Sequence, residues 1–253
     1  SSSGSVTVIG STFINTTARD GGAISSSGSV TVIGSTFINT TARDGGAISS
    51  SGSVTVIGST FINTTATRSG GAILSTPGNI DVRDSTFINI KSGTAGGAIA
   101  SSADIDVADS TFTNTTALFG GSIFSESGNV AVSGSAFTNT VATISTGGSI
   151  YSYRNVIVSD SIFTNTTAET EGGAIYGHDS VTVTNSTFKD NSAKEYGAAI
   201  LTDGGLNVKD CTFNSPNANG TAIIYIESYN NYDVNLTNNT IESNLLAIYN
   251  DGG

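Results

Sequence analysis

The residues best suited to chemistry in this sequence are four aspartates in two neighbouring segments, Asp81, Asp84, Asp106 and Asp109. Four carboxylates this close along a repeat can hold a calcium ion or act as a general acid and base. Arg83 is the one cation beside them, and charged residues normally lie exposed to solvent. We therefore favour a solvated acidic face, and we expect no catalytic residue, no bound metal and no cofactor.

The single histidine and the single cysteine do not form a second chemical centre. His178 follows "GGAIYG" in a predicted turn, and no second histidine exists to complete a metal or nucleophile constellation with it. Cys211 stands where the eight preceding repeats have serine, which predicts a small inward side chain rather than a reactive thiol. The glycine-rich segments lack the G-x-x-x-x-G-K-[ST] pattern of a phosphate loop.

A repeat of about 25 residues organises the whole chain. Residues 1–24 recur letter for letter as residues 25–48, and a third copy stays identical from Ser49 to Ala66. One phenylalanine marks each repeat, with an isoleucine in the tenth: Phe13, Phe37, Phe61, Phe87, Phe112, Phe137, Phe163, Phe188, Phe213 and Ile241. Periods of 20 to 50 residues are typical of solenoid proteins.

Each repeat contains three short apolar runs separated by turn residues, which in the first repeat are "SVTV", "STFIN" and "GGAIS". Apolar residues alternate with period two in these runs, which predicts strands rather than helices. An isoleucine anchors the third run of every repeat: Ile24, Ile48, Ile73, Ile99, Ile123, Ile150, Ile175, Ile200, Ile223 and Ile248. The sequence therefore predicts an all-β fold, a right-handed parallel β-helix of about ten coils with 24 to 28 residues and three strands per coil.

An asparagine closes the second run of most repeats, often within the glycosylation sequon "NTT". The equivalent positions are Asn15, Asn39, Asn63, Asn89, Asn114, Asn139 and Asn165. We expect these amides to face inward and to bond to the amide of the next coil, as a structural ladder that leaves none of them free for a glycan. Sequons in less regular turns are better glycosylation candidates, namely Asn185, Asn219, Asn235 and Asn238.

A strip of apolar and aromatic residues follows the anchoring isoleucines on the outward side of the predicted third strands. The predicted contact strip consists of Phe119, Phe124, Ile144, Tyr151, Tyr153, Tyr176 and Leu201. A large exposed apolar strip often marks a contact site, although a packed turn can also cover it. We expect a glycan or a neighbouring rod to dock on this strip.

Composition restricts the partners of the chain. Nine Lys and Arg residues against 20 Asp and Glu give a net charge of −11, which argues against nucleic acid or an anionic membrane surface as a partner. No apolar run reaches the roughly 18 residues of a membrane-spanning helix, so we expect no membrane insertion within this segment. The absence of methionine indicates a fragment of a longer repeat protein.

The run "FINTTARDGGAI", from Phe13 to Ile24, resembles the repeat of polymorphic outer membrane proteins and of adhesin-like surface proteins of bacteria and methanogenic archaea. Its GGA[ILV] half recurs along the chain, while the usual F-x-x-N spacing occurs only at Phe188 and Asn191. The resemblance implies a surface-exposed right-handed β-helix. It carries over no catalytic or ligand-binding residue.

These observations predict one domain over residues 1–253, with near-identical, stalk-like coils in 1–66 and diverged coils in 67–253. We expect an extracellular structural or adhesive protein that projects from the cell surface or stacks into filaments. Its expected partners are other copies of itself, or a host or neighbouring cell-surface protein or glycan. Two alternatives stay open. One is a polysaccharide-active enzyme, because parallel β-helices include lyases and hydrolases, and the other is an ice-binding solenoid with threonine rows such as Thr7, Thr31 and Thr55.

Overall fold

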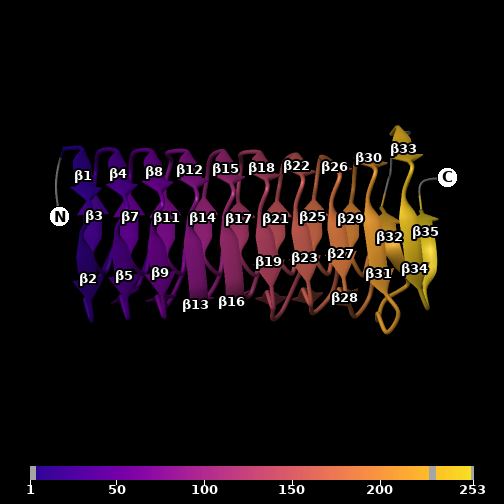
Figure 1. The fold of residues 1–253 in the computed structure, drawn as a ribbon, viewed down its shortest axis with the longest axis horizontal. Coiled ribbons are helices and arrows are strands. Elements are labelled where there is room, and N and C mark those ends of the chain that lie inside the picture. The colour runs from indigo at the N-terminus through magenta and orange to yellow at the C-terminus, as the bar shows by residue number, and fades with distance from the viewer. Residues whose placement is uncertain (1–3, 228–231, 252–253) are drawn as a thin grey trace.

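The computed structural model describes residues 4–227 and 232–251, and it shows a straight rod of ten stacked coils. The chain runs from one end of the rod to the other, so the two termini lie at opposite ends (Figure 1). All regular elements in the described residues are β-strands, and they form three parallel sheets that run along the rod. The predicted parallel β-helix with three strands per coil is confirmed.

Sheet 1 collects the first strand of every coil, and sheet 3 collects the last. Sheet 1 contains β1 (Val6–Ile9), β4 (Val30–Ile33), β8 (Val54–Ile57), β12 (Ile80–Arg83), β15 (Ile105–Ala108), β18 (Val130–Ser133), β22 (Val156–Ser159), β26 (Ser180–Thr184), β30 (Gly205–Lys209) and β33 (Val234–Thr237). Sheet 3 contains β3 (Ile24–Ser26), β7 (Ile48–Ser50), β11 (Ile73–Ser75), β14 (Ile99–Ser101), β17 (Ile123–Ser125), β21 (Ile150–Ser152), β25 (Ile175–Gly177), β29 (Ile200–Thr202), β32 (Ala222–Ile226) and β35 (Leu246–Asn250).

Sheet 2 lies between them in chain order and bends where several coils add a short second strand. Its main path contains β2 (Thr12–Ile14), β5 (Thr36–Ile38), β9 (Thr60–Ile62), β13 (Thr86–Ser92), β16 (Thr111–Ala117), β19 (Ala136–Thr138), β23 (Ile162–Thr164), β27 (Thr187–Lys189), β31 (Thr212–Ser215) and β34 (Thr240–Ser243). The short strands are β6 (Thr41–Ala42), β10 (Thr65–Ala66), β20 (Val141–Ala142), β24 (Thr167–Ala168) and β28 (Ser192–Ala193). In β13 and β16 the two parts are continuous.

Left-handed backbone conformations turn the chain at fixed points of each coil. The residue after each sheet 1 strand has a positive φ in all ten coils, from Gly10 at 55° to Asn238 at 54°. Glycine, aspartate and asparagine adopt this conformation most readily, and only these three types occupy the position. Asp84 and Asp109, at φ of 50° and 49°, therefore stand there because the turn requires such a residue.

The two glycines of the GGA[ILV] motif meet two different constraints. The first, such as Gly96, has a φ of 61° and no room for a side chain. The second lies so close to the next coil that a Cβ atom on Gly97 would stand 1.8 Å from the carbonyl oxygen of Gly121. The motif is therefore a consequence of close stacking between coils, and Ala198 replaces the second glycine where the following coil changes its path.

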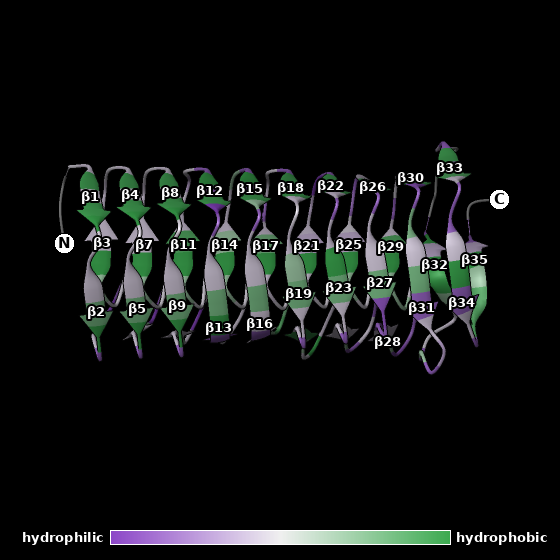
Figure 2. Cartoon of the chain, in the orientation of Figure 1, coloured by the Kyte–Doolittle hydropathy of each residue, from purple (hydrophilic) through white to green (hydrophobic). Residues whose placement is uncertain are grey.

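Identical side chains stack in columns inside the rod. Eight phenylalanines from Phe37 to Phe213 are fully buried, and successive rings in this column lie nearly parallel with centroids 4.7 to 4.9 Å apart. Valine, isoleucine and leucine from sheets 1 and 3 complete the core. Figure 2 shows green, hydrophobic segments in the strands of all three sheets, with purple in strands such as β12 and β30 and in many of the connecting turns. Burial of these columns supplies the main driving force for folding.

A serine column satisfies the backbone at the corner between sheets 1 and 2. The amide of Ser35 donates to the hydroxyl of Ser59 at 3.1 Å, while the Ser35 hydroxyl donates to the carbonyl of Ile33 at 3.0 Å. Cys211 continues this column as a buried residue, and its thiol donates to the carbonyl of Lys209 at 3.2 Å. The prediction of a small inward side chain at this position is confirmed.

The anchoring isoleucine of the ninth coil is not the predicted one. Ile200 of β29 pairs with Ile224 of β32, and Ile224 in turn pairs with Ile248 of β35. The carbonyl oxygen of Ile223 instead accepts a hydrogen bond from the backbone amide of Ala199. Ile223 therefore stands at the position that is alanine in the regular coils, directly before the anchoring isoleucine. The prediction of Ile223 was wrong by one residue, because the run "AII" offers two isoleucines and this coil lacks the regular double glycine.

A buried threonine column begins the second part of sheet 2, and its hydroxyls have unequal surroundings. Within the described residues, the hydroxyls of Thr16, Thr40 and Thr64 are buried without a hydrogen-bond partner. In two later coils the motif alanine becomes serine, and each serine hydroxyl meets the threonine hydroxyl of its own coil, Thr115 with Ser122 and Thr140 with Ser149. The change from GGA to GGS therefore supplies the missing partner.

We predict opposite effects for one substitution at two equivalent positions. Thr40→Val should raise the free energy of unfolding by about 1 kcal/mol, because it removes a buried hydroxyl that has no partner. Thr140→Val should lower the free energy of unfolding by about 1 to 2 kcal/mol, because it leaves the Ser149 hydroxyl unpaired. Urea unfolding of both variants measures the difference, and equal effects of the two substitutions would contradict this account.

Candidate functional site

The outer face of sheet 3 carries a column of aromatic and apolar side chains. Register along the sheet aligns the outward residues that follow the anchoring isoleucines: Leu74, Ala100, Phe124, Tyr151, Tyr176, Leu201, Tyr225 and Tyr249. The Phe124 and Tyr151 ring centroids are 5.2 Å apart, and those of Tyr151 and Tyr176 are 4.8 Å apart. We call Phe124, Tyr151 and Tyr176 the aromatic column.

Most of the predicted contact strip is covered rather than exposed. Leu201 is fully buried, and Tyr151 and Tyr176 retain only 7% and 9% of their surface. Phe119 and Phe124 are half-buried, so only Ile144 and Tyr153, at 58% and 42%, are exposed members of the strip. Of the two alternatives for the strip, coverage by packed side chains holds for Tyr151, Tyr176 and Leu201, and exposure does not.

Side chains from neighbouring turns account for this burial. The ring of Phe119 meets Tyr151 edge-on at 6.3 Å, and Tyr153 meets it edge-on from another turn at 5.0 Å. Further along, Tyr196 packs on Tyr225 at 4.6 Å. The column is therefore a second small core outside the main one, bordered by the exposed Tyr153 and by the half-buried rings of Phe119 and Phe124. Ile144 is exposed in the turn that precedes β21.

Acidic side chains, which the sequence analysis missed, border the far end of this column. The Tyr176 hydroxyl donates to Asp203 at 2.7 Å, and His178 lies 3.6 Å from the same carboxylate oxygen. Burial, followed by the negative charges of Glu227, Asp203 and Glu195, raises the pKa of the half-buried Glu171 from 4.5 to about 7. Burial also raises the pKa of Asp203. We call Glu171, Glu195, Asp203 and Glu227 the acidic cluster.

Alternation could have located part of the cluster. His178, Asp203 and Glu227 each stand two residues after a member of the outward column, so they share its face of the sheet. Glu171 comes from the turn before the strand, where it pairs with Tyr196 of the next coil. Nothing in the sequence alone indicates that this turn approaches the column.

A different, more exposed group contains the four aspartates Asp81, Asp84, Asp106 and Asp109. Arg83 lies between two coils, 3.0 Å from Asp81 and 3.4 Å from Asp106. Its positive charge therefore offsets part of the charge of both carboxylates, and Asp84 and Asp109 serve the turn described above. Within residues 4–227 and 232–251, no group of three or more His, Cys, Asp or Glu side chains is placed to hold a metal ion.

The asparagine row forms along the outside of the rod. The side-chain amide of each asparagine donates to the amide oxygen of the preceding coil at 2.7 to 3.1 Å, from Asn39 on Asn15 to Asn165 on Asn139. All seven residues are exposed, so the expected inward orientation was wrong. Each has a φ between 52° and 56°, and this left-handed turn resets the alternation so that the following threonine or isoleucine points inward.

The four predicted glycosylation candidates are all exposed but differ in their hydrogen bonds. The amides of Asn185 and Asn238 donate to Asp160 and Asp210 of the preceding coils, at 2.6 and 3.1 Å. The side chains of Asn219 and Asn235 form no hydrogen bond within the described part of the chain, so these two remain the more accessible candidates.

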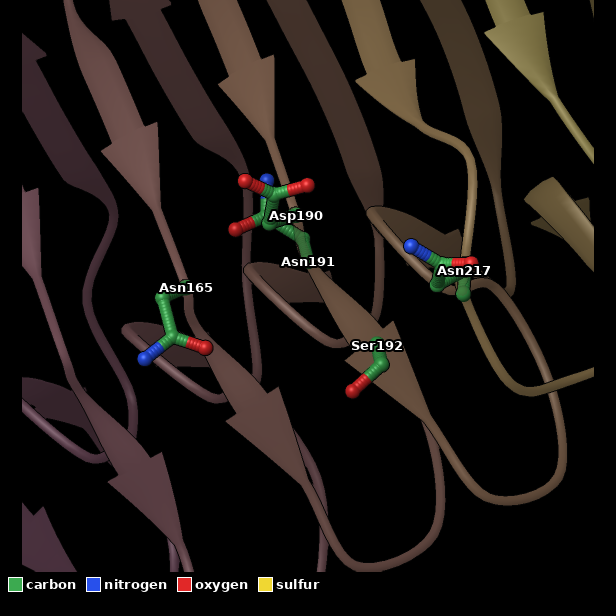
Figure 3. A pocket seen from close by; sticks show the side chains of 6 residues that line it. Asn165, Asp190, Asn191, Ser192 and Asn217 are labelled. Carbon is green, nitrogen blue, oxygen red and sulfur yellow. The ribbon is translucent and has the colours of Figure 1, made fainter.

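Among the cavities on the described surface of the rod, two lie beside the features above. The larger, of about 430 Å³, lies where the asparagine row ends, between Asn165, Asp190, Ser192 and Asn217 (Figure 3). One of its buried lining residues, Asn191, uses its amide inside the coil stack, where it accepts from Thr166 and donates to the carbonyl of Phe163.

The smaller cavity, of about 220 Å³, lies on the outer face of sheet 3 beside Phe124. Unlike the first, it has an apolar floor, formed by Leu74, Ala100 and Phe124. A concave apolar surface with a few polar groups at its edge is the usual form of a small-molecule site.

A family comparison agrees with the architecture. The family described as "Right handed beta helix region" matches residues 70–241. This chain belongs to the right-handed β-helix family. No curated protein and no solved structure matches the chain significantly. No helix that could span a membrane occurs in the described ranges of this β-helix.

We predict that the stability of the β-helix falls as the pH rises from about 4.5 to about 7. The pKa of Glu171 is higher in the folded than in the unfolded chain, so folding favours the protonated acid and loses that advantage as the acid ionises. Solvent reaches this half-buried group, and the expected loss is on the order of 1 kcal/mol. Thermal unfolding across this range should show the fall, and Glu171→Gln should flatten it. Glu126→Gln, outside the cluster, is the control and should leave the profile unchanged.

Proposed function

We propose that this chain is part of an extracellular structural or adhesive protein. It projects from a cell surface or assembles on it, and it binds a partner surface through the outer face of sheet 3. The partner is a glycan, a neighbouring cell-surface protein or another rod of the same kind. The observation that carries the proposal is the exposed edge of the aromatic column, where Tyr153 packs on Tyr151 and leaves part of its own side chain in solvent. Ile144, in the turn before the third strand of the same coil, is a second exposed apolar side chain.

The distribution of side chains along the rod supports separate roles for its two parts, with binding by the diverged coils and length from the near-identical ones. The aromatic column and its edge occur in the diverged coils after residue 67, whereas coils 1 to 3 carry serine or leucine at the same outward position. The near-identical coils therefore contribute length, which carries the edge away from an anchoring point. The likeness of "FINTTARDGGAI" to repeats of polymorphic outer membrane and adhesin-like proteins supports a location at the cell surface.

Replacement of the two exposed side chains tests this surface. Tyr153→Ser combined with Ile144→Ser should reduce binding to a glycan array, or self-association in sedimentation velocity, at least tenfold, because exposed aromatic and apolar anchors dominate such contacts. Ile157→Ser combined with Ile162→Ser is the matched control, since these isoleucines are about equally exposed on the other sheets. Unchanged binding and self-association in the first double variant would rule out this edge as the contact surface.

A polysaccharide-active enzyme is the second candidate, and the acidic cluster favours it. A carboxylic acid with a pKa of about 7 is suited to donate a proton to a leaving group near neutral pH, while the neighbouring Asp203 supplies a second carboxylate. In this assignment Glu171 is the general acid. The Asp81 and Asp106 pair, neutralised in part by Arg83, is less suited to the role.

Incubation with a panel of neutral and acidic polysaccharides, with reducing ends measured over time, tests this second candidate. Any turnover should fall by a factor of about 100 or more in Glu171→Gln. The variant that combines Asp81→Asn and Asp106→Asn should retain full activity and serves as the control. Turnover that survives Glu171→Gln would exclude this residue as the acid.

A further inference from the structure

The aromatic column ends abruptly at Ala100. Tyr176 stacks on Tyr151, and Tyr151 stacks on Phe124, but the next residue in register is an alanine. Beyond it, Leu74 continues the column in the preceding coil. The ring of Phe124 is therefore packed by Tyr151 on one side and faces a single methyl group on the other.

The smaller cavity lies at this point of the column. Its floor consists of Leu74, Ala100 and Phe124, and its volume of about 220 Å³ is small for a peptide segment. Tyr153 meets Phe124 edge-on with ring centroids 6.2 Å apart, and Tyr151 stacks on it at 5.2 Å. These contacts hold the ring of Phe124 in place before any ligand arrives.

The polar groups at the rim carry both signs of charge. On one side the nearly buried Asp44 lies 2.9 Å from Arg43 and 3.5 Å from Arg68, whose side chain is mostly exposed. On the other side stands Glu126, which forms no ion pair within the described residues. Arg68 retains N–H groups that can donate, and Glu126 has oxygens that can accept. This near balance of charge suits a neutral ligand that carries several hydroxyl groups.

We infer that this cavity binds one neutral sugar ring, with a C–H face of the ring against Phe124 and its hydroxyls toward Arg68 and Glu126. A pyranose has the required combination of an apolar face and a polar edge, and it continues the column at the place where the next ring would stack. The inference rests on the proposed function and names the ligand class for that face of the rod. A uronic acid is a poorer ligand, because its carboxylate would approach Glu126 and Asp44.

Saturation-transfer NMR on the intact chain tests the inference. The probes are the methyl glycosides of glucose, galactose, mannose and N-acetylglucosamine, with methyl glucuronide as the charged counterpart. At least one neutral glycoside should receive saturation at its ring C–H protons, and the glucuronide should receive much less. Absence of transfer to all four neutral glycosides overturns the inference.

A filled cavity provides the decisive variant. Ala100→Leu introduces a leucine in the fourth coil, and the third coil already has a leucine, Leu74, at the equivalent position. The outward column should therefore accommodate the new side chain, which fills the cavity. Transfer should fall at least tenfold in this variant. Ser25→Leu, in the same outward column but far from the cavity, is the matched control and should bind as the unmodified chain does. Transfer that persists in Ala100→Leu also overturns the inference.

Two further measurements keep this test distinct from the test of the proposed function. Phe124→Leu removes the ring and should also abolish transfer, which gives an independent variant if Ala100→Leu does not fold. One combination of results overturns the sugar site alone. In it, the Tyr153 and Ile144 double variant loses glycan-array binding or self-association, Ala100→Leu keeps it, and no neutral glycoside receives saturation. Unchanged binding in that double variant, together with sugar transfer that Ala100→Leu removes, would instead support the sugar site and count against the exposed edge.

Discussion

Each coil of this rod is held by backbone hydrogen bonds to the coils before and after it, so every side chain stands beside its equivalent at about 4.8 Å. This spacing selects residues that pack well against copies of themselves. Phenylalanine stacks on phenylalanine, the hydroxyl of each serine accepts from the backbone amide of the serine in the preceding coil, and asparagine donates to asparagine. A charged residue beside its own copy is repelled, which is consistent with a chain in which only 11% of residues are charged.

Several of the positive charges are paired with a carboxylate of a neighbouring coil. Arg43 lies between Asp20 and Asp44, and Lys194 pairs with Glu169 of the preceding coil. Glu171 of the acidic cluster differs, because every charged group that shifts its pKa is a carboxylate. The gap at Ala100 is the corresponding departure among apolar columns. The two places where self-complementary stacking breaks down are therefore the two candidate sites for chemistry or binding.

Period-two alternation within a repeat of about 25 residues was sufficient to predict the parallel β-helix, the serine column and the inward Cys211. Three details depended on geometry that the pattern does not contain. The outward orientation of Asn15 follows from a left-handed turn that resets the alternation, and Ile224 replaces Ile223 because one coil changes its path. Burial of Tyr151 arises from Phe119 and Tyr153, which reach it from separate turns. Each depends on contacts between segments that local spacing does not connect.

The identical sequences of the first repeats also affect how the chain folds. Thr7 of the first coil pairs with Thr31, yet Thr55 of the third coil would offer it the same neighbours and the same hydrogen bonds. A nascent chain can therefore pair the first coil with the third and leave the second looped out, with little energetic penalty at the contact itself. The diverged coils do not share this ambiguity, because their ion pairs and aromatic contacts identify each neighbour. Folding that begins among the diverged coils and proceeds toward residue 4 avoids this mispairing. Each identical coil then docks on the folded coil that directly follows it in the chain.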